Sequence, residues 1–524
     1  MNYTNNPNIT IYENHRTLKS KPILEHFLKT DQIETYLIER NFNSKEDTEM
    51  FGNILKSSKN LKYLKLNLFG NLGLGFEIIF EGLSENKSIE KLFFSFTNLT
   101  SEHLEIVGKF FENTKTLKSI EFDIPDEYLQ FILSNLLENK NLNLKRIIFQ
   151  STYCFDRFSC SLFGEFLKDT KSLTSFEIKS NFILGPINQI LQGIIENKSL
   201  ESFFIGCLED FESKEIQQII RSERNLIKKI KLSLRKNPEE LLKSLKLIPD
   251  LVEIDLKGSK MKNVKLEIFK EMLQFMFEST EYLYLTNCNF DKEQFKYFGK
   301  NLNQFKKLKI LILDGNRILE EVAEDLFESL GDNTTLETLN MSICDLEEGN
   351  CLEILGKSMK KNTTLKNLDI NVFEPSKENE IKFFHHLKEN NTLERLFVSI
   401  KDLSSLGDFV RNTKTLKSLH LQYFIRTDED IKYFLDSLKE NESIEILEGM
   451  EFHTKSRLDM FRDCLEYNRH LINIPFFNSK PEFKVEITKL CRLVIQNQKT
   501  KETQSHFRNL NSFQKFFDIK FCTK

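Results

Sequence analysis

The 524-residue sequence is poor in glycine and proline, with 18 Gly and 9 Pro. Such low counts argue against a β-sandwich with many tight turns and against long proline-rich linkers. No apolar run approaches the roughly eighteen residues that a transmembrane helix needs. The 74 Lys+Arg and 78 Asp+Glu leave a net charge of -4, so no strong overall field attracts nucleic acid or an anionic membrane.

Cysteine is sparse and irregularly placed. The nine cysteines, an odd number, run from Cys154 to Cys522 without a C-x-x-C pair. This pattern predicts neither a disulfide framework nor a zinc site. The N-terminal segment has no basic stretch followed by an apolar one, so it does not read as a secretory signal. We therefore expect a reducing compartment and a cytoplasmic location.

Apolar bulk, by contrast, is plentiful. The sequence contains 48 Phe, and hydrophobic residues make up 40% of it. Its length suits either about three ordinary domains or one elongated array. The choice between them depends on whether the sequence repeats.

A repeat is present and keeps its phase. One stretch reads Leu308-Lys-Ile-Leu311-Ile-Leu313-Asp-Gly-Asn316-Arg-Ile318, and the next Leu336-Glu-Thr-Leu339-Asn-Met341-Ser-Ile-Cys344-Asp-Leu346. Both follow the pattern L-x-x-L-x-L-x-x-[N/C]-x-L. The first position recurs at residues 33, 61, 89, 117, 144, 173, 200, 227, 251, 280, 308, 336, 365, 393, 416, 444 and 471, mostly 27 to 29 residues apart.

These units resemble the leucine-rich repeat family, and their spacing is similar to that of its ribonuclease-inhibitor-like subfamily. Departures from the pattern occur: Phe or Ile often replaces Leu, and the unit from Ile444 has Gly449 at a core position. The resemblance implies an α/β solenoid shaped as a horseshoe. A parallel sheet would line its concave face and helices its convex face, over about 17 repeats.

The same architecture follows from the physics of one unit. Positions four and six point to one face of a short strand, and a helical pattern such as Glu105–Phe111 comes after it. Helices are wider than strands, about 10 Å against about 4.8 Å, so a stack of such units curves. Terminal units expose an apolar side, so we interpret 1–32 as an N-terminal cap, 33–478 as the array and 479–524 as a C-terminal helical cap.

An asparagine recurs just before many of the strands, at Asn86, Asn197, Asn333, Asn362, Asn390 and Asn441. Because asparagine tolerates the left-handed conformation, we interpret these residues as stops at the ends of helices. Each also begins an N-x-[ST] pattern, so glycosylation is the alternative interpretation.

No catalytic, cofactor or metal residue stands out. The glycine-rich segment 69–75 lacks the lysine of a phosphate loop. Adjacent His385 and His386 would point about 100° apart on a helix, which is a poor start for a metal site. Cys288 and Cys344, at position nine, are interpreted as packing residues. The sequence thus predicts a protein that is not an enzyme and has no cofactor.

Binding residues are expected at positions three, five and seven, which face away from the buried side of each strand. Apolar anchors bordered by charge are typical of a protein interface. The alternative is that these side chains only pack on one another. The candidates are an apolar group of Tyr282, Tyr284, Ile310 and Ile312, bordering Asp255 and Asp314, and the separate residues Phe93, Phe204 and Phe397.

Two basic stretches, 221–248 and 480–524, could in principle bind RNA or lipid. We interpret them instead as a solvated surface and as part of the C-terminal cap, and we expect neither a nucleic-acid nor a membrane partner. The sequence favours a scaffold or adaptor that binds a protein on the concave face, either alone or as a subunit of a larger assembly. The alternative is a GTPase regulator resembling the Ran GTPase-activating protein.

Overall fold

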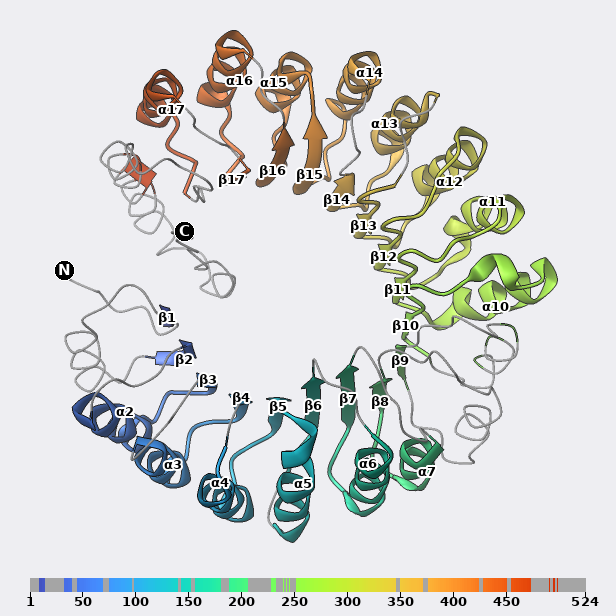
Figure 1. The fold of residues 1–524 in the computed structure, drawn as a ribbon. Helices are drawn as coiled ribbons and strands as arrows, with labels where there is room; N and C mark the ends of the chain where they lie inside the picture. Colours follow the sequence, from blue (N-terminus) through green and yellow to red (C-terminus); the bar gives the residue numbers. More distant parts are fainter. Residues whose placement is uncertain are drawn as a thin grey trace. The chain divides into compact units, whose positions relative to one another are not determined.

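The computed structural model describes residues 9–14, 33–39, 45–68, 75–96, 99–139, 143–151, 156–180, 188–205, 228–231, 251–344, 349–370, 376–423, 427–449 and 454–472, with the single positions 239, 242, 245, 490, 493, 494 and 497. The chain divides into two compact units, one built mainly from residues up to Ser233 and the other mainly from Leu234 onward. Each unit is a series of strand–helix repeats (Figure 1).

The first unit contains parallel strands that alternate with helices. Its strands are β1 Ile9–Asn14, β2 Ile33–Glu39, β3 Tyr63–Leu68, β4 Lys91–Phe96, β5 Ser119–Asp123, β6 Arg146–Ser151, β7 Ser175–Ser180, β8 Ser202–Ile205 and β9 Lys229–Lys231. Its helices are α2 Lys45–Ser57, α3 Gly75–Glu85, α4 Ser101–Asn113, α5 Leu129–Glu138, α6 Arg157–Asp169 and α7 Asn188–Glu196, with a 3-10 turn η1 at Asp126–Tyr128.

The second unit repeats the arrangement. Its strands are β10 Glu253–Asp255, β11 Tyr282–Tyr284, β12 Ile310–Ile312, β13 Thr338–Asn340, β14 Asn367–Ile370, β15 Arg395–Ile400, β16 Ser418–Tyr423 and β17 Ile446–Glu448. Its helices are α10 Leu266–Ser279, α11 Lys292–Lys300, α12 Glu320–Asp332, α13 Cys351–Lys361, α14 Lys377–Leu387, α15 Leu403–Asn412, α16 Asp428–Glu440 and α17 Lys455–Tyr467, with 3-10 turns η2 Met261–Asn263 and η3 Leu302–Gln304.

The strand register confirms the repeat phase read from the sequence. Position three of each unit pairs with position three of the next, as in Tyr282 with Ile310 and Ile310 with Thr338. The same rule holds in the first unit, where Tyr63 pairs with Lys91 and Lys91 with Ser119. The fold is an α/β solenoid of the leucine-rich-repeat type, as predicted; the single continuous horseshoe stays a prediction.

The core of each unit lies between its strands and its helices. Positions four and six point into it, so that Leu311 and Leu313 are fully buried. In the first unit the core is rich in phenylalanine: Phe94, Phe122 and Phe149 occupy position six of successive strands, and their stacked rings lie 6.3 and 5.3 Å apart. In the second unit, leucine, methionine, isoleucine or valine occupies position six, except at Gly449. None of the described helices has the length and apolar character needed to cross a bilayer.

Gly449 explains one departure from the pattern. It stands at position six but has a φ of +84°, and a Cβ there would lie 1.7 Å from the carbonyl oxygen of Leu421. Only glycine accommodates both the left-handed backbone and this close approach to the neighbouring strand. The missing core side chain is thus the consequence of a backbone contact.

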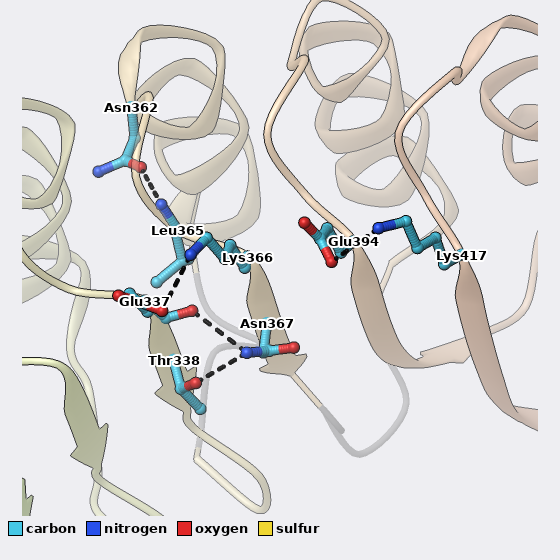
Figure 2. Close-up of polar contacts among 8 residues, drawn as sticks. All are labelled: Glu337, Thr338, Asn362, Leu365, Lys366, Asn367, Glu394 and Lys417. Carbon is cyan, nitrogen blue, oxygen red and sulfur yellow. Dashed lines mark hydrogen bonds and ion pairs between the residues drawn. The ribbon is translucent and has the colours of Figure 1, made fainter. Parts of the chain in front are cut away.

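The asparagines at the helix ends tie each repeat to the one before it. The amide of Asn362 donates to the carbonyl oxygens of Leu330 and Asn333 at 2.7 and 3.1 Å. Its Oδ1 accepts from the N–H of Thr364 at 2.9 Å and from that of Leu365 at 2.8 Å; Figure 2 shows the bond to Leu365. The same arrangement, with carbonyls of the preceding repeat and N–H groups of its own loop, recurs at Asn197, Asn390, Asn441 and Asn468.

These asparagines end the helices, but not through the predicted left-handed backbone. Asn362 has φ −69° and ψ 132°, and Asn441 has φ −81° and ψ 128°, both extended. The prediction of a left-handed stop was wrong because the side chain, not the backbone conformation, satisfies the polar groups at the helix end. Most of these side chains are buried, with Asn362 only 2% exposed, which argues against the glycosylation alternative.

The described terminal residues extend the periodic contacts beyond the predicted array. β1 lies within 1–32 and pairs in parallel with β2, so the sheet includes a strand before Ile33. At the other end, Asn497 donates to the carbonyl oxygens of Asn468 and Leu471, both at 3.0 Å, as the earlier asparagines do. Most of the predicted N-terminal cap, 1–32, and most of the predicted C-terminal cap, 479–524, lie outside the described residues.

Asn390 and Asn391 are adjacent and allow a matched test of the asparagine hydrogen bonds to the preceding repeat. Asn390→Ala leaves buried backbone carbonyl and N–H groups without partners, so we expect it to lower the free energy of unfolding by about 2–4 kcal/mol. Asn391 is exposed, and Asn391→Ala should change it by less than about 0.5 kcal/mol. Urea unfolding followed by circular dichroism measures both; equal effects would contradict the proposed role of the buried amide.

Leu311 and Ile312 test the orientation of the strand. Leu311 points into the core, and Leu311→Ala should cost about 2–5 kcal/mol through the lost contacts and the cavity. Ile312 points away from the core, and Ile312→Ala should cost about 1 kcal/mol or less. Thermal or urea unfolding compares the two, and the reverse order would show that the strand faces are wrongly assigned.

Candidate functional site

The candidate binding residues lie on the strand face, by which we mean the side of the sheet turned away from the helices. Positions three, five and seven of each repeat point to this face. In β11 and β12 the burial alternates, with Leu283 and Leu311 buried and the residues on either side of each partly exposed. The strand face is therefore available for side chains that the core does not need.

The predicted apolar group is assembled as expected. Tyr282 pairs with Ile310 and Tyr284 with Ile312, so the four side chains occupy two rows across adjacent strands. All four are partly exposed. We call these four residues the apolar patch. Aromatic and branched aliphatic side chains at such close spacing form a surface that excludes water when a partner covers it.

Acidic residues border the apolar patch. Asp255 on β10 pairs with Tyr284, which places its carboxylate in the same row as Tyr284 and Ile312. Asp314 follows β12, and its Oδ1 accepts from the N–H of Ser342 at 3.1 Å. Burial raises the pKa of Asp314 above its ordinary value, and the charge of Asp369 acts in the same direction. Asp255 is thus next to Tyr284 in its row, and Asp314 lies two residues after Ile312.

Asp369 is part of this border but was not selected from the sequence. It is next but one to Ile312 in the same row, because Ile312 pairs with Asn340 and Asn340 with Asp369. The hydroxyl of Ser342 donates to Asp369, while the backbone N–H of Ser342 donates to Asp314. The repeat phase places Asp369 at position five. It does not show that Asp369 and Asp314 share Ser342 as a hydrogen-bond donor.

The separate aromatic candidates have different environments. Phe93 is only 8% exposed, and the ammonium of Lys65 lies 4.5 Å from its ring centre. It is therefore mainly a packing residue, since its neighbours on the strand face cover it. Phe204 is partly exposed. Phe397 is partly exposed too, but its ring stacks on that of His420 at 3.9 Å, and Nδ1 of His420 lies 2.8 Å from Glu448 Oε2.

A polar groove of about 640 Å³ lies elsewhere in the second unit, along the loops that lead from helices into strands. Its charged residues pair across repeats: Lys366 with Glu337 at 3.0 Å and Lys417 with Glu394 at 3.2 Å (Figure 2). Exposed pairs of this kind contribute little stability, about 0–1 kcal/mol. Because the groove hydroxyls of Thr335 and Thr364 also bond to the preceding repeat, we interpret it as part of the joint between repeats.

The cysteines at position nine are held in packing roles. Sγ of Cys288 lies 3.1 Å from the carbonyl oxygen of Leu256, and Sγ of Cys344 lies 3.3 Å from that of Leu313. Burial raises the pKa of each thiol to about 12, so each stays protonated at neutral pH. Neither has the exposed thiolate that a nucleophile requires.

The adjacent histidines considered as metal ligands lie on a helix. The rings of His385 and His386 are 5.5 Å apart on α14, and partial burial lowers the pKa of His386. Across the part of the chain that the structure describes, no three His, Cys, Asp or Glu side chains are grouped as metal ligands would be. Most of the glycine-rich segment 69–75 lies outside the described residues, as do most of 221–248 and nearly all of 480–524.

Glu380 is a buried acid outside the strand face. It is 2% exposed, and its carboxyl oxygens accept from the N–H of Lys401 and Asp402 at 2.8 and 2.7 Å. Burial raises the pKa of Glu380 to about 7, because the charged form loses its hydration. The two backbone N–H groups oppose this shift. The stability of the folded chain therefore depends on pH through Glu380, which lies between α14 and α15.

This linkage has a definite sign. The pKa of Glu380 is higher in the folded chain than the unfolded value of 4.5, so its contribution to stability is greatest below pH 4.5 and is lost as pH rises to about 7. Relative to Glu380→Gln, the native chain should lose on the order of 2–3 kcal/mol over this interval. Urea unfolding of both chains from pH 4.5 to 8 measures the difference. A constant offset, without a change in slope, would contradict the raised pKa.

Comparisons with known proteins add little to this geometry. No protein-family model matches the chain, and no curated protein matches it. Among solved structures, leiomodin-1 actin-binding site 2 is 15% identical and the match covers 34% of this chain and 93% of that one, with a TM-score of 0.24. The structure of a TLR13–ssRNA13 complex is 12% identical over 88% of this chain and 74% of that one, with a TM-score of 0.39. Similarities this low carry no argument, so the fold assignment depends on the repeat itself.

Proposed function

We propose that this chain is a non-enzymatic scaffold or adaptor that binds a protein partner on the strand face of its second unit. The observation that carries the proposal is the apolar patch: four partly exposed apolar side chains in two rows on adjacent paired strands. A sheet fixed by its neighbours loses little conformational entropy when a partner binds, so most of the contact energy is retained as affinity. The acidic border adds selectivity for the partner's charge.

The proposal includes a more specific classification and location. The spacing of 27 to 29 residues between most units supports the ribonuclease-inhibitor-like subfamily of leucine-rich repeats. The free, buried cysteines among the described residues suit a reducing compartment such as the cytoplasm. Membership of a larger assembly is compatible with a strand face that carries several candidate anchors.

The apolar patch can be tested by a double substitution. Tyr284→Ala with Ile312→Ala removes two central anchors, and we expect it to reduce capture of the partner about tenfold or more while the chain stays folded. Ile381→Ala is the control, since Ile381 is 44% exposed but lies on helix α14. The measurement is affinity capture from native lysate with quantitative mass spectrometry, with folding checked by circular dichroism.

The comparison uses only those proteins that both the native chain and the Ile381→Ala control capture. Proteins lost with the double substitution support the proposal, and an unchanged set would remove it. A panel of small GTPases distinguishes the alternative, because a GTPase regulator would accelerate GTP hydrolysis and a scaffold would not. We expect no acceleration.

A further inference from the structure

The charged residues around the apolar patch indicate which charge the partner carries, in addition to the apolar surface that it buries. At positions three, five and seven of β10 to β14, the described residues include four acids, Glu253, Asp255, Asp314 and Asp369, against the single base Lys257. The first unit differs: at these positions its β3 to β9 carry six bases, Lys65, Lys91, Arg146, Lys179, Lys229 and Lys231, against three acids, Glu121, Asp123 and Glu177, among the described residues. Among the described positions, acids therefore outnumber bases around the patch, whereas bases outnumber acids in the first unit.

The acids are arranged on both sides of the patch. In row five the order across successive strands is Asp255, Tyr284, Ile312, Asn340 and Asp369. At about 4.8 Å per strand, the two acids are about 19 Å apart, with the apolar pair between them. A partner that covers Tyr284 and Ile312 therefore meets a carboxylate at either end of the contact.

Asp314 and Asp369 form the more confined of these acidic positions. They lie on either side of Ser342, whose backbone N–H donates to Asp314 and whose hydroxyl donates to Asp369. Ser342 fixes both carboxylates in place. Burial and the charge of Asp369 both raise the pKa of Asp314, while the Ser342 N–H and the charge of Lys257 act in the opposite direction. A cation from outside would relieve the repulsion between two partly desolvated like charges.

We infer that the partner contributes a segment in which a large apolar side chain is flanked by arginine or lysine. The apolar side chain packs on Tyr284 and Ile312, and a cationic side chain binds Asp314 and Asp369. This inference rests on the proposed function and specifies the partner's chemistry at the same surface. A phosphate backbone is disfavoured there, because it would meet the same carboxylates as like charges.

The probe is a library of random linear peptides displayed on phage and selected against the full chain. We expect selected peptides to combine a large apolar residue with Arg or Lys. Synthetic copies are then measured by fluorescence anisotropy against the native chain, Tyr284→Ala with Ile312→Ala, and Asp314→Asn with Asp369→Asn. Asparagine keeps an oxygen that can accept from Ser342, so the second pair removes charge with little change of shape.

Each pair of substitutions should weaken binding about tenfold or more, corresponding to about 1.4 kcal/mol. Glu328→Gln, an exposed residue on α12, is the control and should leave affinity unchanged. A second measurement leaves the protein intact: replacing the peptide's arginine with neutral citrulline should weaken binding by a similar factor. Added salt should weaken the arginine peptide more than the citrulline peptide.

The outcomes separate the two proposals. Peptides that need Tyr284 and Ile312 but bind equally well with citrulline, or with Asp314→Asn and Asp369→Asn in a folded chain, would overturn the inference and leave the proposed function standing. If no selected peptide depends on Tyr284 and Ile312, the apolar patch is not a docking surface. The proposed function then fails, and the inference fails with it.

Discussion

The side-chain amide of the asparagines that follow many of the helices is the contact on which the repeat arrangement depends. A helix that ends inside a protein leaves carbonyl groups without partners, and a chain that turns into a strand leaves N–H groups in the same condition. Asn362 satisfies both kinds at once, with its NH₂ on carbonyls of the preceding repeat and its oxygen on N–H groups of its own loop. One residue thereby closes a repeat and fixes its position against its neighbour.

A second set of contacts holds the other end of the strands. The amide of Asn316 donates to the carbonyl oxygens of Leu285 and Leu313, and its oxygen accepts from the N–H of Cys288. Cys288 and Cys344 take the same place with a thiol. Since polar side chains secure both ends and apolar side chains fill the core, stability makes little demand on the strand face. That freedom allows Tyr284, Ile312 and their acidic neighbours to serve recognition.

The two units have the same strand–helix repeat but different core and surface side chains. Stacked phenylalanines such as Phe94 and Phe122 occupy position six of neighbouring strands in the first unit, whereas mostly aliphatic side chains occupy that position in the second. Their strand faces differ as well, with bases prominent in the first and acids around the apolar patch of the second. Repetition fixes the backbone, and variation at positions that the backbone does not constrain gives each stretch its own surface chemistry.

The sequence by itself determined the strand phase, the buried positions four and six, and the rows in which Tyr282, Tyr284, Ile310 and Ile312 stand, because a fixed period and strand alternation settle which side chains share a face. It did not determine how Asn362 ends its helix. Asparagine suits both a left-handed backbone and a side-chain hydrogen bond to the preceding repeat, so its presence does not distinguish the two. Nor did it show that Lys65 covers Phe93 or that Ser342 joins Asp314 to Asp369. Those facts depend on contacts between residues about 27 to 28 positions apart, and only the packed tertiary structure decides which side chains meet.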